Sequence, residues 1–502
     1  MKSISFEKEV LDPLVSFIEK KPNNLAFSID DKEYSYKLFG GYISKIINEI
    51  RKNCCEESNV GLVINNDIET YASIFALWME GKCYVPLHPN WPIERCEDII
   101  TQVCLQHVMD SSVKTRYKNV KVIDLNGLKY DVSPIEYQKN VAETDLAYIL
   151  FTSGSTGQPK GVKITRGNVA AFMNSFWETG ISISETDRCL QCFDLSFDVS
   201  VQSYLVALTR GASVFTVPTG QMKYLSIGGL IEEKHITFGA MAPSVLRYLQ
   251  PYYEEIDFSS LKQCILTAEA VPMDLVDDWL KYARNTVAYD FYGPTEGTIY
   301  STAYRIKGDG HDKTYNGIVS VGKPLVNMVA IIVDEAGKEV DVGEKGELYI
   351  AGPQVTSGYW NNNEKNKTAF SVLNCNNSPV RFYHTGDLCY LDKDGDIFYS
   401  GRIDNQAKIQ GFRVELSEIE FHARTFLEGK NVVCVVCENE KKLDEILMFV
   451  ESQKTDTQGL VTYMRSKMPQ YMIPKTIRFV EEFPINANGK IDRKKLKSLV
   501  NK

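Results

Sequence analysis

The sequence lacks the features of membrane, nucleic-acid-binding and disulfide-stabilised proteins. No apolar stretch approaches the roughly 18–20 residues of a membrane-spanning helix, and the start, MKSISFEKEV, has no secretory-type apolar run. The 502 residues include 56 basic and 65 acidic side chains, so the formal net charge is −9 and positive charge is not in surplus. The 12 cysteines are scattered without a framework spacing. We therefore expect a cytoplasmic protein with free thiols that binds neither membrane nor nucleic acid.

The fold class follows from alternating patterns. Short β-branched runs alternate with amphipathic stretches over the first 400 residues, for example VGLVIN (60–65), AYILFT (147–152), ASVFTV (212–217) and QCILTA (263–268). This alternation predicts α/β layers around largely buried sheets. Between Val321 and Tyr359, strand-like runs separated by turn-rich pieces predict a β-rich subdomain.

A domain boundary is predicted near residue 404. A single core stops growing at about 250–300 residues, so this chain needs at least two domains. From Asn405 onward there are 17 basic and 13 acidic side chains, which makes this part about +4 and the preceding part about −13. We expect a large N-terminal α/β domain over 1–403 and a small, mobile α+β C-terminal domain over 404–502. Apolar runs predict strands of the small domain at 431–437 and 446–450.

The strongest local signal is a loop rich in glycine, serine and threonine. FTSGSTGQPKGV (151–162) directly follows the apolar strand AYIL. Glycines let backbone amides curve around an anion, and hydroxyls and a lysine add donors and charge. No G-K-[ST] closes the loop and no GxGxxG is present, so neither a Walker A loop nor a dinucleotide fingerprint fits. A flexible surface loop would not explain the preceding strand. Phosphate-binding candidates are Thr152, Ser153, Gly154, Ser155, Thr156, Gly157 and Lys160.

TSGSTGQPKG resembles the phosphate-loop signature of adenylate-forming enzymes, which include acyl-CoA synthetases, luciferases and nonribosomal-peptide adenylation domains. Seven further blocks are similar to motifs of this superfamily, in its order. They are GKCYVPLHPNWPIER (81–95), FDVS (197–200), YGPTE (292–296), GELYIAGPQVTSGYW (346–360), YHTGD (383–387), GRIDNQAKIQGFRVELSEIE (401–420) and NGKIDR (488–493). The last two are similar to the branch that loads amino acids onto carriers, including D-alanine–carrier protein ligases.

The resemblance assigns the chemistry to particular residues. Adenylation joins a carboxylate to the α-phosphate of ATP and expels pyrophosphate, so cations and donors must stand where negative charge accumulates. Lys490 is implied as the catalytic lysine between the two anions, where a solvated lysine of the basic tail is the alternative. Glu296 is implied as the ligand of Mg²⁺, a cation that prefers oxygen ligands.

The resemblance also implies the nucleotide contacts and a hinge. Asp387 would bind the ribose hydroxyls with support from Arg402, Tyr292 would stack on adenine, and Thr295 would bind phosphate. Asp290, where many relatives have asparagine, would lie near the exocyclic amine of adenine; Phe291 and Gly293 complete this nucleotide-binding set. At Asp404 the small domain of relatives rotates between adenylation and thioester formation, and residues 408–411 would then line a tunnel for a phosphopantetheine thiol.

The substrate class is inferred from one aspartate. FDLSFDVS holds two FDxS matches, and the spacing to Gly211 that the resembling family shows favours Asp198 over Asp194. Asp198 resembles the aspartate that pairs with the substrate's ammonium group in amino-acid-activating relatives; facing an acyl chain, a buried carboxylate would be uncompensated. The remaining substrate-binding positions implied are Val199, Gln202, Ala240, Ile265, Thr267, Phe291, Ile299 and Tyr300. With no second charge and three bulky residues, this set predicts a small neutral amino acid, proline-like or alanine-like; serine and glycine also fit.

We expect ATP and Mg²⁺ as cofactors and a separate phosphopantetheinylated carrier protein as partner. No carrier serine motif follows Lys502 and no HHxxxDG occurs, so a freestanding enzyme is expected. Two alternatives remain open: an acyl- or aryl-CoA ligase that would accept free CoA, and a catalytically silent relative that binds a nucleotide for regulation.

Overall fold

The computed structural model describes residues 4–130, 134–154, 158–218, 222–375, 378–452, 456–484 and 491–498. The chain divides into two compact units, each assembled from separate segments. Unit 1 comprises Met1–Pro89, Gln102–Leu150 and Gly161–Ile403; unit 2 comprises Asn90–Thr101, Phe151–Lys160 and Asp404–Lys502. Within the described ranges, no helix is long and apolar enough to cross a membrane.

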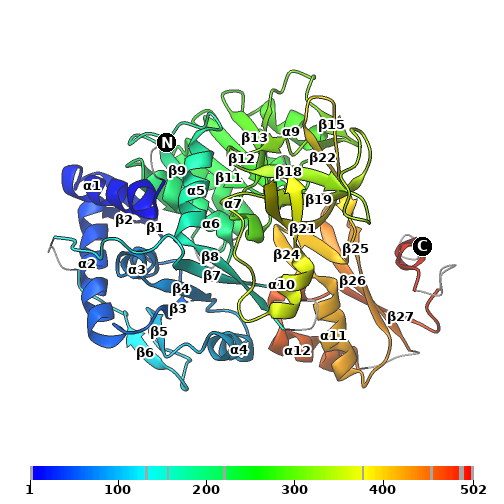
Figure 1. Cartoon of the computed structure of the whole chain (residues 1–502), viewed down its shortest axis with the longest axis horizontal. Helices are drawn as coiled ribbons and strands as arrows, with labels where there is room; N and C mark the ends of the chain where they lie inside the picture. Colours follow the sequence, from blue (N-terminus) through cyan, green and yellow to red (C-terminus); the bar gives the residue numbers. More distant parts are fainter. Residues whose placement is uncertain are drawn as a thin grey trace. The chain divides into compact units, whose positions relative to one another are not determined.

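A nine-stranded mixed sheet forms the centre of unit 1, in the order β17-β14-β13-β12-β11-β9-β10-β1-β2 (Figure 1). Its six middle strands are parallel, and β14, β17 and β2 add antiparallel edges. The strands are Leu25–Ile29 (β1), Lys32–Ser35 (β2), Arg188–Gln191 (β9), Ser213–Thr216 (β10), Phe238–Met241 (β11), Gln263–Thr267 (β12), Val287–Tyr292 (β13), Thr302–Ile306 (β14) and Lys323–Pro324 (β17). The strands predicted around 212–217 and 263–268 are confirmed as β10 and β12.

The two faces of this sheet belong to different cores. Successive side chains along a strand point to opposite faces, so Ile265 lies in one apolar cluster and Leu266 in the other. The Leu266 face packs against helices α7 (Lys223–Glu233), α8 (Pro243–Leu249) and α9 (Met273–Leu280). The Ile265 face shares its cluster with α6 (Asp198–Leu208), every residue of which is buried. A helix buried all round needs apolar residues on all sides, so a charged residue at its start is conspicuous.

A second sheet has six strands in the order β6-β5-β3-β4-β7-β8, mostly paired in parallel. Its strands are Asn59–Val63 (β3), Cys83–Leu87 (β4), His107–Asp110 (β5), Lys121–Asp124 (β6), Leu146–Thr152 (β7) and Lys160–Thr165 (β8). In the sequence, the helices that precede, separate or follow these strands are α1 (Asp12–Lys20), α2 (Tyr36–Asn53), α3 (Ile68–Met79), α4 (Ile93–Val103) and α5 (Arg166–Trp177). Asp67 begins α3 by accepting a hydrogen bond from the backbone N–H of Thr70 at 2.8 Å, an N-cap interaction.

The predicted β-rich subdomain is confirmed, but it extends beyond Tyr359. Five antiparallel strands follow the order β18-β19-β21-β20, with β22 on β21. They are Val329–Val333 (β18), Gly346–Ala351 (β19), Phe370–Cys375 (β20), Ser378–Leu391 (β21) and Ile397–Arg402 (β22), and α10 (Asn363–Ala369) precedes β20. These added strands were not predicted, because β20 does not alternate regularly between apolar and polar residues and is largely half-exposed.

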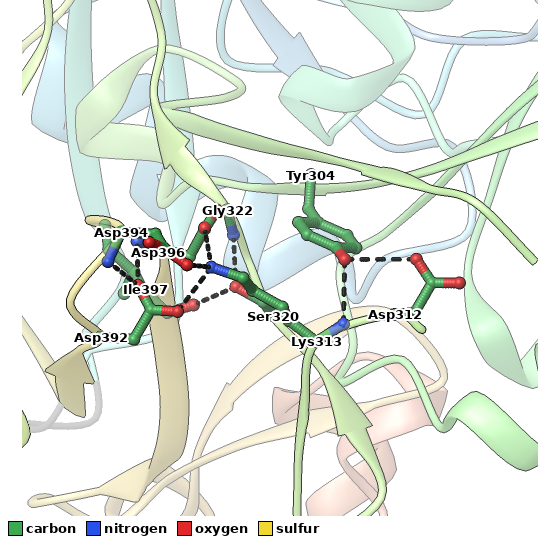
Figure 2. Close-up of polar contacts among 9 residues, drawn as sticks. All are labelled: Tyr304, Asp312, Lys313, Ser320, Gly322, Asp392, Asp394, Asp396 and Ile397. Carbon is green, nitrogen blue, oxygen red and sulfur yellow. Dashed lines mark hydrogen bonds and ion pairs between the residues drawn. The ribbon is translucent and has the colours of Figure 1, made fainter. Parts of the chain in front are cut away.

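One lysine ties the turn before β22 to the small hairpin of β15 (Thr314–Tyr315) and β16 (Ile318–Val319) (Figure 2). The ammonium of Lys313 lies 2.6 Å from a carboxylate oxygen of Asp392 and 2.7 Å from one each of Asp394 and Asp396. These carboxylates raise the pKa of Lys313, and the lysine lowers the pKa of Asp394. The lysine thereby neutralises part of the negative charge of this turn, whose three carboxylates would otherwise repel one another.

Unit 2 contains a three-stranded sheet of Val432–Glu438 (β25), Asp444–Glu451 (β26) and Thr476–Val480 (β27). Helices α11 (Leu416–Phe426) and α12 (Thr457–Lys467) contribute to the core on one face, and α13 (Arg493–Ser498) to the core on the other. A two-stranded ribbon, β23 (Gln406–Ile409) and β24 (Phe412–Glu415), precedes α11. The strands predicted at 431–437 and 446–450 correspond to β25 and β26.

Candidate active site

Asp198 is the first residue of α6 and is 6% exposed. Burial raises its pKa to about 6, and the charge of Glu296 acts in the same direction. Hydrogen bonds from the backbones of Ile299 and Val199 and from the side chain of Thr295 partly oppose this shift. Its Oδ2 atom is buried and has no hydrogen-bond partner among the described residues. This buried carboxylate oxygen therefore lacks the hydrogen-bond donor or cation that would stabilise it.

Asp194, the other match to FDxS, is fully satisfied. Its Oδ2 atom lies 2.8 Å from Nε2 of His88, and its Oδ1 atom accepts hydrogen bonds from the backbone and hydroxyl of Ser196. Burial opposes ionisation, but these partners prevail and hold the pKa of Asp194 at about 2. Its structural role is thus to fix the segment that leads into α6. His88 was missed by the sequence analysis, which had no means of pairing residues 106 positions apart.

Gln202 lies one turn after Asp198 on α6, on the same helical face. The hydroxyl of Tyr300 donates to its Oε1 atom at 3.3 Å. Gln202 is 0% exposed, and its Nε2 atom has no hydrogen-bond partner within the part of the chain that the structure describes. Val199 is also buried in this helix.

Four further predicted substrate positions share one face of the nine-stranded sheet. In the parallel register Ala240 pairs with Ile265, and Thr267 pairs with Phe291. Paired residues of neighbouring strands point to the same side, as do residues two apart on one strand. The ring of Phe291 packs edge-on against Tyr300, with centroids 5.1 Å apart. The strand register thus brings together the positions taken from β11, β12 and β13.

Asp290 is 3% exposed and, as the neighbour of Phe291 on β13, points to the opposite face. In the register it pairs with Leu266 and Tyr304. The structure therefore separates Asp290 from the four side chains on the Thr267 face. Its predicted contact with the adenine amine stays a prediction.

The turn between β13 and β14 is folded back tightly on itself. Ile299 has a φ of 72°, a left-handed conformation that is strained for a β-branched residue. A Cβ atom on Gly293 would lie 2.5 Å from the carbonyl oxygen of Ile299, so only glycine fits there. Gln354 holds the turn by donating to the carbonyl of Tyr300 at 2.6 Å and accepting, through its backbone oxygen, from the hydroxyl of Thr298. Gln354 is a positioning residue that the motif reading did not include.

Glu296 lies in this turn, follows the half-buried Thr295, and is 0% exposed. Its Oε1 atom accepts a hydrogen bond from the hydroxyl of Tyr359 at 2.6 Å. A single buried carboxylate suits Mg²⁺, which commonly takes one or two carboxylates and fills its other positions with water and phosphate oxygens. The donor set is thus compatible with the predicted metal role. The described residues contain no cluster of three or more His, Cys, Asp or Glu that could hold a metal alone.

Asp387 on β21 is held from two sides. Its Oδ1 atom lies 2.8 Å from Nη1 of Arg402, and its Oδ2 atom accepts from the hydroxyl of Tyr292 at 2.5 Å. Burial raises the pKa of Tyr292 far above its usual value, and the neighbouring Asp387 charge adds to this. Arg402 also donates to the backbone oxygen of Thr385 at 3.1 Å. Three residues predicted from separate motifs therefore form one buried network.

The described part of the phosphate loop belongs to unit 2. The backbone N–H of Gly154 donates to Oε2 of Glu418 at 2.9 Å, and Oε1 of Glu418 lies 2.7 Å from Nη1 of Arg95. The hydroxyl of Ser153 donates to the backbone oxygen of Arg413 at 3.1 Å. The Oγ1 atom of Thr152 is buried without a partner among the described residues. The backbone amide of Gly154 is thus hydrogen-bonded to a carboxylate of the chain itself, and phosphate binding by this loop stays a prediction.

The predicted loop cation, Lys160, is 8% exposed and its ammonium lies 3.7 Å from Oε1 of Glu415. Ser155, Thr156, Gly157 and Lys490 lie outside the described residues, so their predicted roles stay predictions. Asp404 is exposed and its Oδ1 atom accepts from the backbone N–H of Gln406 at 3.0 Å.

The chain matches two models of protein families. The family model of AMP-binding enzymes matches residues 15–360, and that of the AMP-binding enzyme C-terminal domain matches residues 428–490. The chain belongs to the AMP-binding enzyme family. This family lies within the adenylate-forming superfamily, as the motifs predicted. The two-part α/β architecture is likewise confirmed by the solved structures of relatives.

This AMP-binding chain is 30% identical to zwittermicin A synthase ZmaJ of Bacillus cereus over 500 residues, covering 95% of the chain and 93% of the relative. The adenylation domain AlmE of Vibrio cholerae, solved in complex with glycyl-adenosine-5′-phosphate, is similar with a TM-score of 0.85 and 21% identity, over 100% of this chain and 98% of that one. The o-succinylbenzoate CoA synthetase MenE of Bacillus subtilis has a TM-score of 0.83 and 20% identity, over 97% and 98%. Against several large synthase subunits, the chain spans less than a tenth of the relative's length.

Proposed function

We propose that this enzyme activates a small neutral amino acid with ATP and then transfers the aminoacyl group to the phosphopantetheine thiol of a separate carrier protein. In the first step a carboxylate oxygen of the amino acid forms a bond to the α-phosphorus of ATP. The bond between the α- and β-phosphates breaks, and pyrophosphate leaves with its electron pair. In the second step the thiol sulfur bonds to the carbonyl carbon, AMP leaves and the thiol proton passes to solvent.

One observation carries the choice of an amino acid. The buried Asp198 has a carboxylate oxygen without a described partner, and its pKa of about 6 leaves it mostly ionised at neutral pH. An α-ammonium group supplies both the positive charge and the hydrogen-bond donor that this oxygen requires. A fatty or aryl acid supplies neither, and would leave the charge uncompensated in an apolar surrounding.

The other residues of the site take roles consistent with this chemistry. Asp387, held by Arg402 and Tyr292, is oriented to accept hydrogen bonds from the ribose hydroxyls. Glu296 would hold Mg²⁺, which neutralises charge on the triphosphate when it is bound. Lys490 would offset the charges of the approaching carboxylate and α-phosphate. We propose Asp404 as the hinge through which the small C-terminal domain, 404–502, changes its position between the two steps.

The competing function is an acyl- or aryl-CoA ligase. The fold does not discriminate, because a CoA synthetase and an amino-acid-type adenylation domain match this chain with nearly equal TM-scores. Discrimination therefore rests on Asp198, and on the acceptor of the second step. A carrier protein should be aminoacylated in preference to free CoA.

The test is pyrophosphate exchange with matched pairs of acids, such as alanine against propionate. We expect at least one amino acid to support exchange more than about 100-fold better than its counterpart without the amino group, because a broken buried ion pair costs about 3–5 kcal/mol. Exchange that depends on fatty or aryl acids alone would refute the proposal. A second assay compares a phosphopantetheinylated carrier protein with CoA as the acceptor.

A further inference from the structure

We propose that Gln202 selects substrates whose side chain carries a hydrogen-bond-accepting oxygen, so that the preferred substrate is a small polar amino acid with a hydroxyl or amide carbonyl. This inference rests on the proposed amino-acid function and narrows the substrate class. It starts from the buried amide nitrogen of Gln202, which has no partner among the described residues although the side chain is 0% exposed. An unsatisfied buried donor is destabilising, and such groups in native proteins call for an explanation.

The orientation of the Gln202 amide is set by its neighbour Tyr300. Burial raises the pKa of Tyr300 far above its usual value, while the hydrogen bond from Thr267 acts in the opposite direction. A donor to the phenol oxygen has this effect, because it stabilises the charged form. Tyr300 then has its own proton left to donate, and that bond goes to Oε1 of Gln202 at 3.3 Å. The two N–H groups on Nε2 of Gln202 consequently do not bond Tyr300 and can donate to a ligand.

The Nε2 atom of Gln202 and the Oδ2 atom of Asp198, both without a described partner, belong to side chains on the same face of α6. Asp198 and Gln202 are four residues apart on α6, so their Cβ atoms are roughly 5–6 Å apart on the same face. Both meet the same segment, since Ile299 donates to Asp198 and the adjacent Tyr300 donates to Gln202. Neither polar atom bonds the other. A ligand that satisfies both must offer a cation and an acceptor a few bonds apart.

Small polar amino acids have this pattern. In serine and threonine a hydroxyl oxygen is two carbons from the ammonium nitrogen, and in asparagine a carbonyl oxygen is one carbon further. Most of the other predicted substrate positions, among them Val199, Ile265 and Ile299, are apolar and buried. The two that carry hydroxyls already use them, since Thr267 donates to Tyr300 and Tyr300 donates to Gln202. A purely aliphatic side chain would leave Nε2 unsatisfied in the complex, which disfavours it.

The experiment uses pairs of amino acids that are close in volume but differ in the acceptor: serine against 2-aminobutyrate, threonine against valine, and asparagine against leucine. Pyrophosphate exchange with the full chain gives kcat/KM for each. We expect one pair to favour the acceptor by about 5–150-fold, the range that corresponds to an unsatisfied buried donor. Direct binding of the same pairs as non-hydrolysable aminoacyl-sulfamoyl adenosines gives a ratio that does not depend on turnover.

Two variants and a control separate selection from structure. In Gln202→Leu the ratio should fall to about 1 or below, with the aliphatic partner of the pair gaining activity. Gln202→Glu, which cannot donate when ionised, should also lose the preference. Ser203→Ala is the matched control, because the Ser203 hydroxyl donates within α6 to the backbone oxygen of Val199. It should keep the wild-type ratio.

The inference is overturned if the wild-type enzyme treats the members of every pair equally or prefers the aliphatic ones, or if Gln202→Leu retains the wild-type ratio. These outcomes leave the proposed function intact, because amino acids would still support exchange. A different result, exchange only with acids that lack an amino group, would defeat the proposed function itself.

Discussion

Replacing Asp198 by asparagine should stabilise the free enzyme and at the same time abolish its activity toward amino acids. Burial raises the pKa of Asp198 from 3.8 to about 6. A shift of roughly 2 pKa units corresponds to about 3 kcal/mol by which folding penalises the ionised carboxylate at neutral pH. Asparagine has nearly the same shape and no charge, so up to about 3 kcal/mol should be recovered. For a unit of roughly 380 residues this is about 4 °C in Tm.

The sign of the pH dependence provides an internal control. Because the folded-state pKa of Asp198 lies above the unfolded value, the protonated form is the one that folding favours. The wild type therefore loses stability as pH rises from about 4 through about 6, and the penalty is complete above that range. The advantage of Asp198→Asn should be largest near pH 7.5 and fall to about 1 kcal/mol at pH 4.5. Urea unfolding of both proteins at the two pH values measures it.

Activity should change in the opposite direction. Without the carboxylate, the substrate's ammonium group would be buried against a neutral amide, which costs about 3–5 kcal/mol, or roughly 10²–10³-fold or more in kcat/KM. Pyrophosphate exchange with the preferred amino acid gives this ratio. Two results would refute this account of Asp198: a variant less stable than the wild type at pH 7.5, or a variant whose kcat/KM for exchange is within tenfold of the wild-type value. The first would show that the free carboxylate is not a cost, and the second that it does not pair with the substrate's ammonium group.

Three further outcomes are expected. Lys313→Met should lower the denaturation midpoint, and more at pH 7 than at about pH 2.5, because Lys313 lowers the pKa values of Asp392 and Asp394 and this stabilisation is lost as pH falls through the lowered values; an equal loss at both pH values would contradict this. Asp387→Asn should weaken ATP binding, measured by equilibrium titration, because Arg402 loses its charged partner and the ribose its acceptor; unchanged affinity would argue against the ribose role. Lys490→Ala should abolish adenylate formation in pyrophosphate exchange while ATP binding persists, whereas retained exchange would exclude the catalytic role.

Much of the fold could be predicted from the sequence because the buried strands carry a continuous apolar pattern. β12 and β25 are short β-branched runs between polar segments, and no tertiary information was needed to place them. β21 was not identified because its 14 residues do not alternate regularly between apolar and polar, and its two halves pair with different partners. Such a strand is stabilised by its neighbours on both sides, and periodicity does not report on neighbours.

The candidate site was predictable as a set of residue types, but its connections were not. The motifs named Asp387, Arg402 and Tyr292 separately, and only the fold shows that they form one network. His88 and Gln354 were absent from the prediction because their roles depend on partners 106 and 54 residues away. A single sequence contains no record of such distances. The two FDxS matches likewise differ in their contacts, since the carboxylate of Asp194 is satisfied and that of Asp198 has an oxygen without a described partner.

The predicted substrate-binding part of unit 1 combines several features that cost free energy. Asp198 and Gln202 each bury an atom without a described partner, and Ile299 is held in a left-handed conformation. Such costs persist only where the surrounding structure is strong enough to impose them, here a fully buried helix and the Gln354 hydrogen bonds. A ligand that supplies an ammonium and an acceptor would relieve two of these costs at once. Ligand binding should accordingly stabilise the enzyme by more than its apolar contacts alone would provide, and a substrate that lacks either group should stabilise it less.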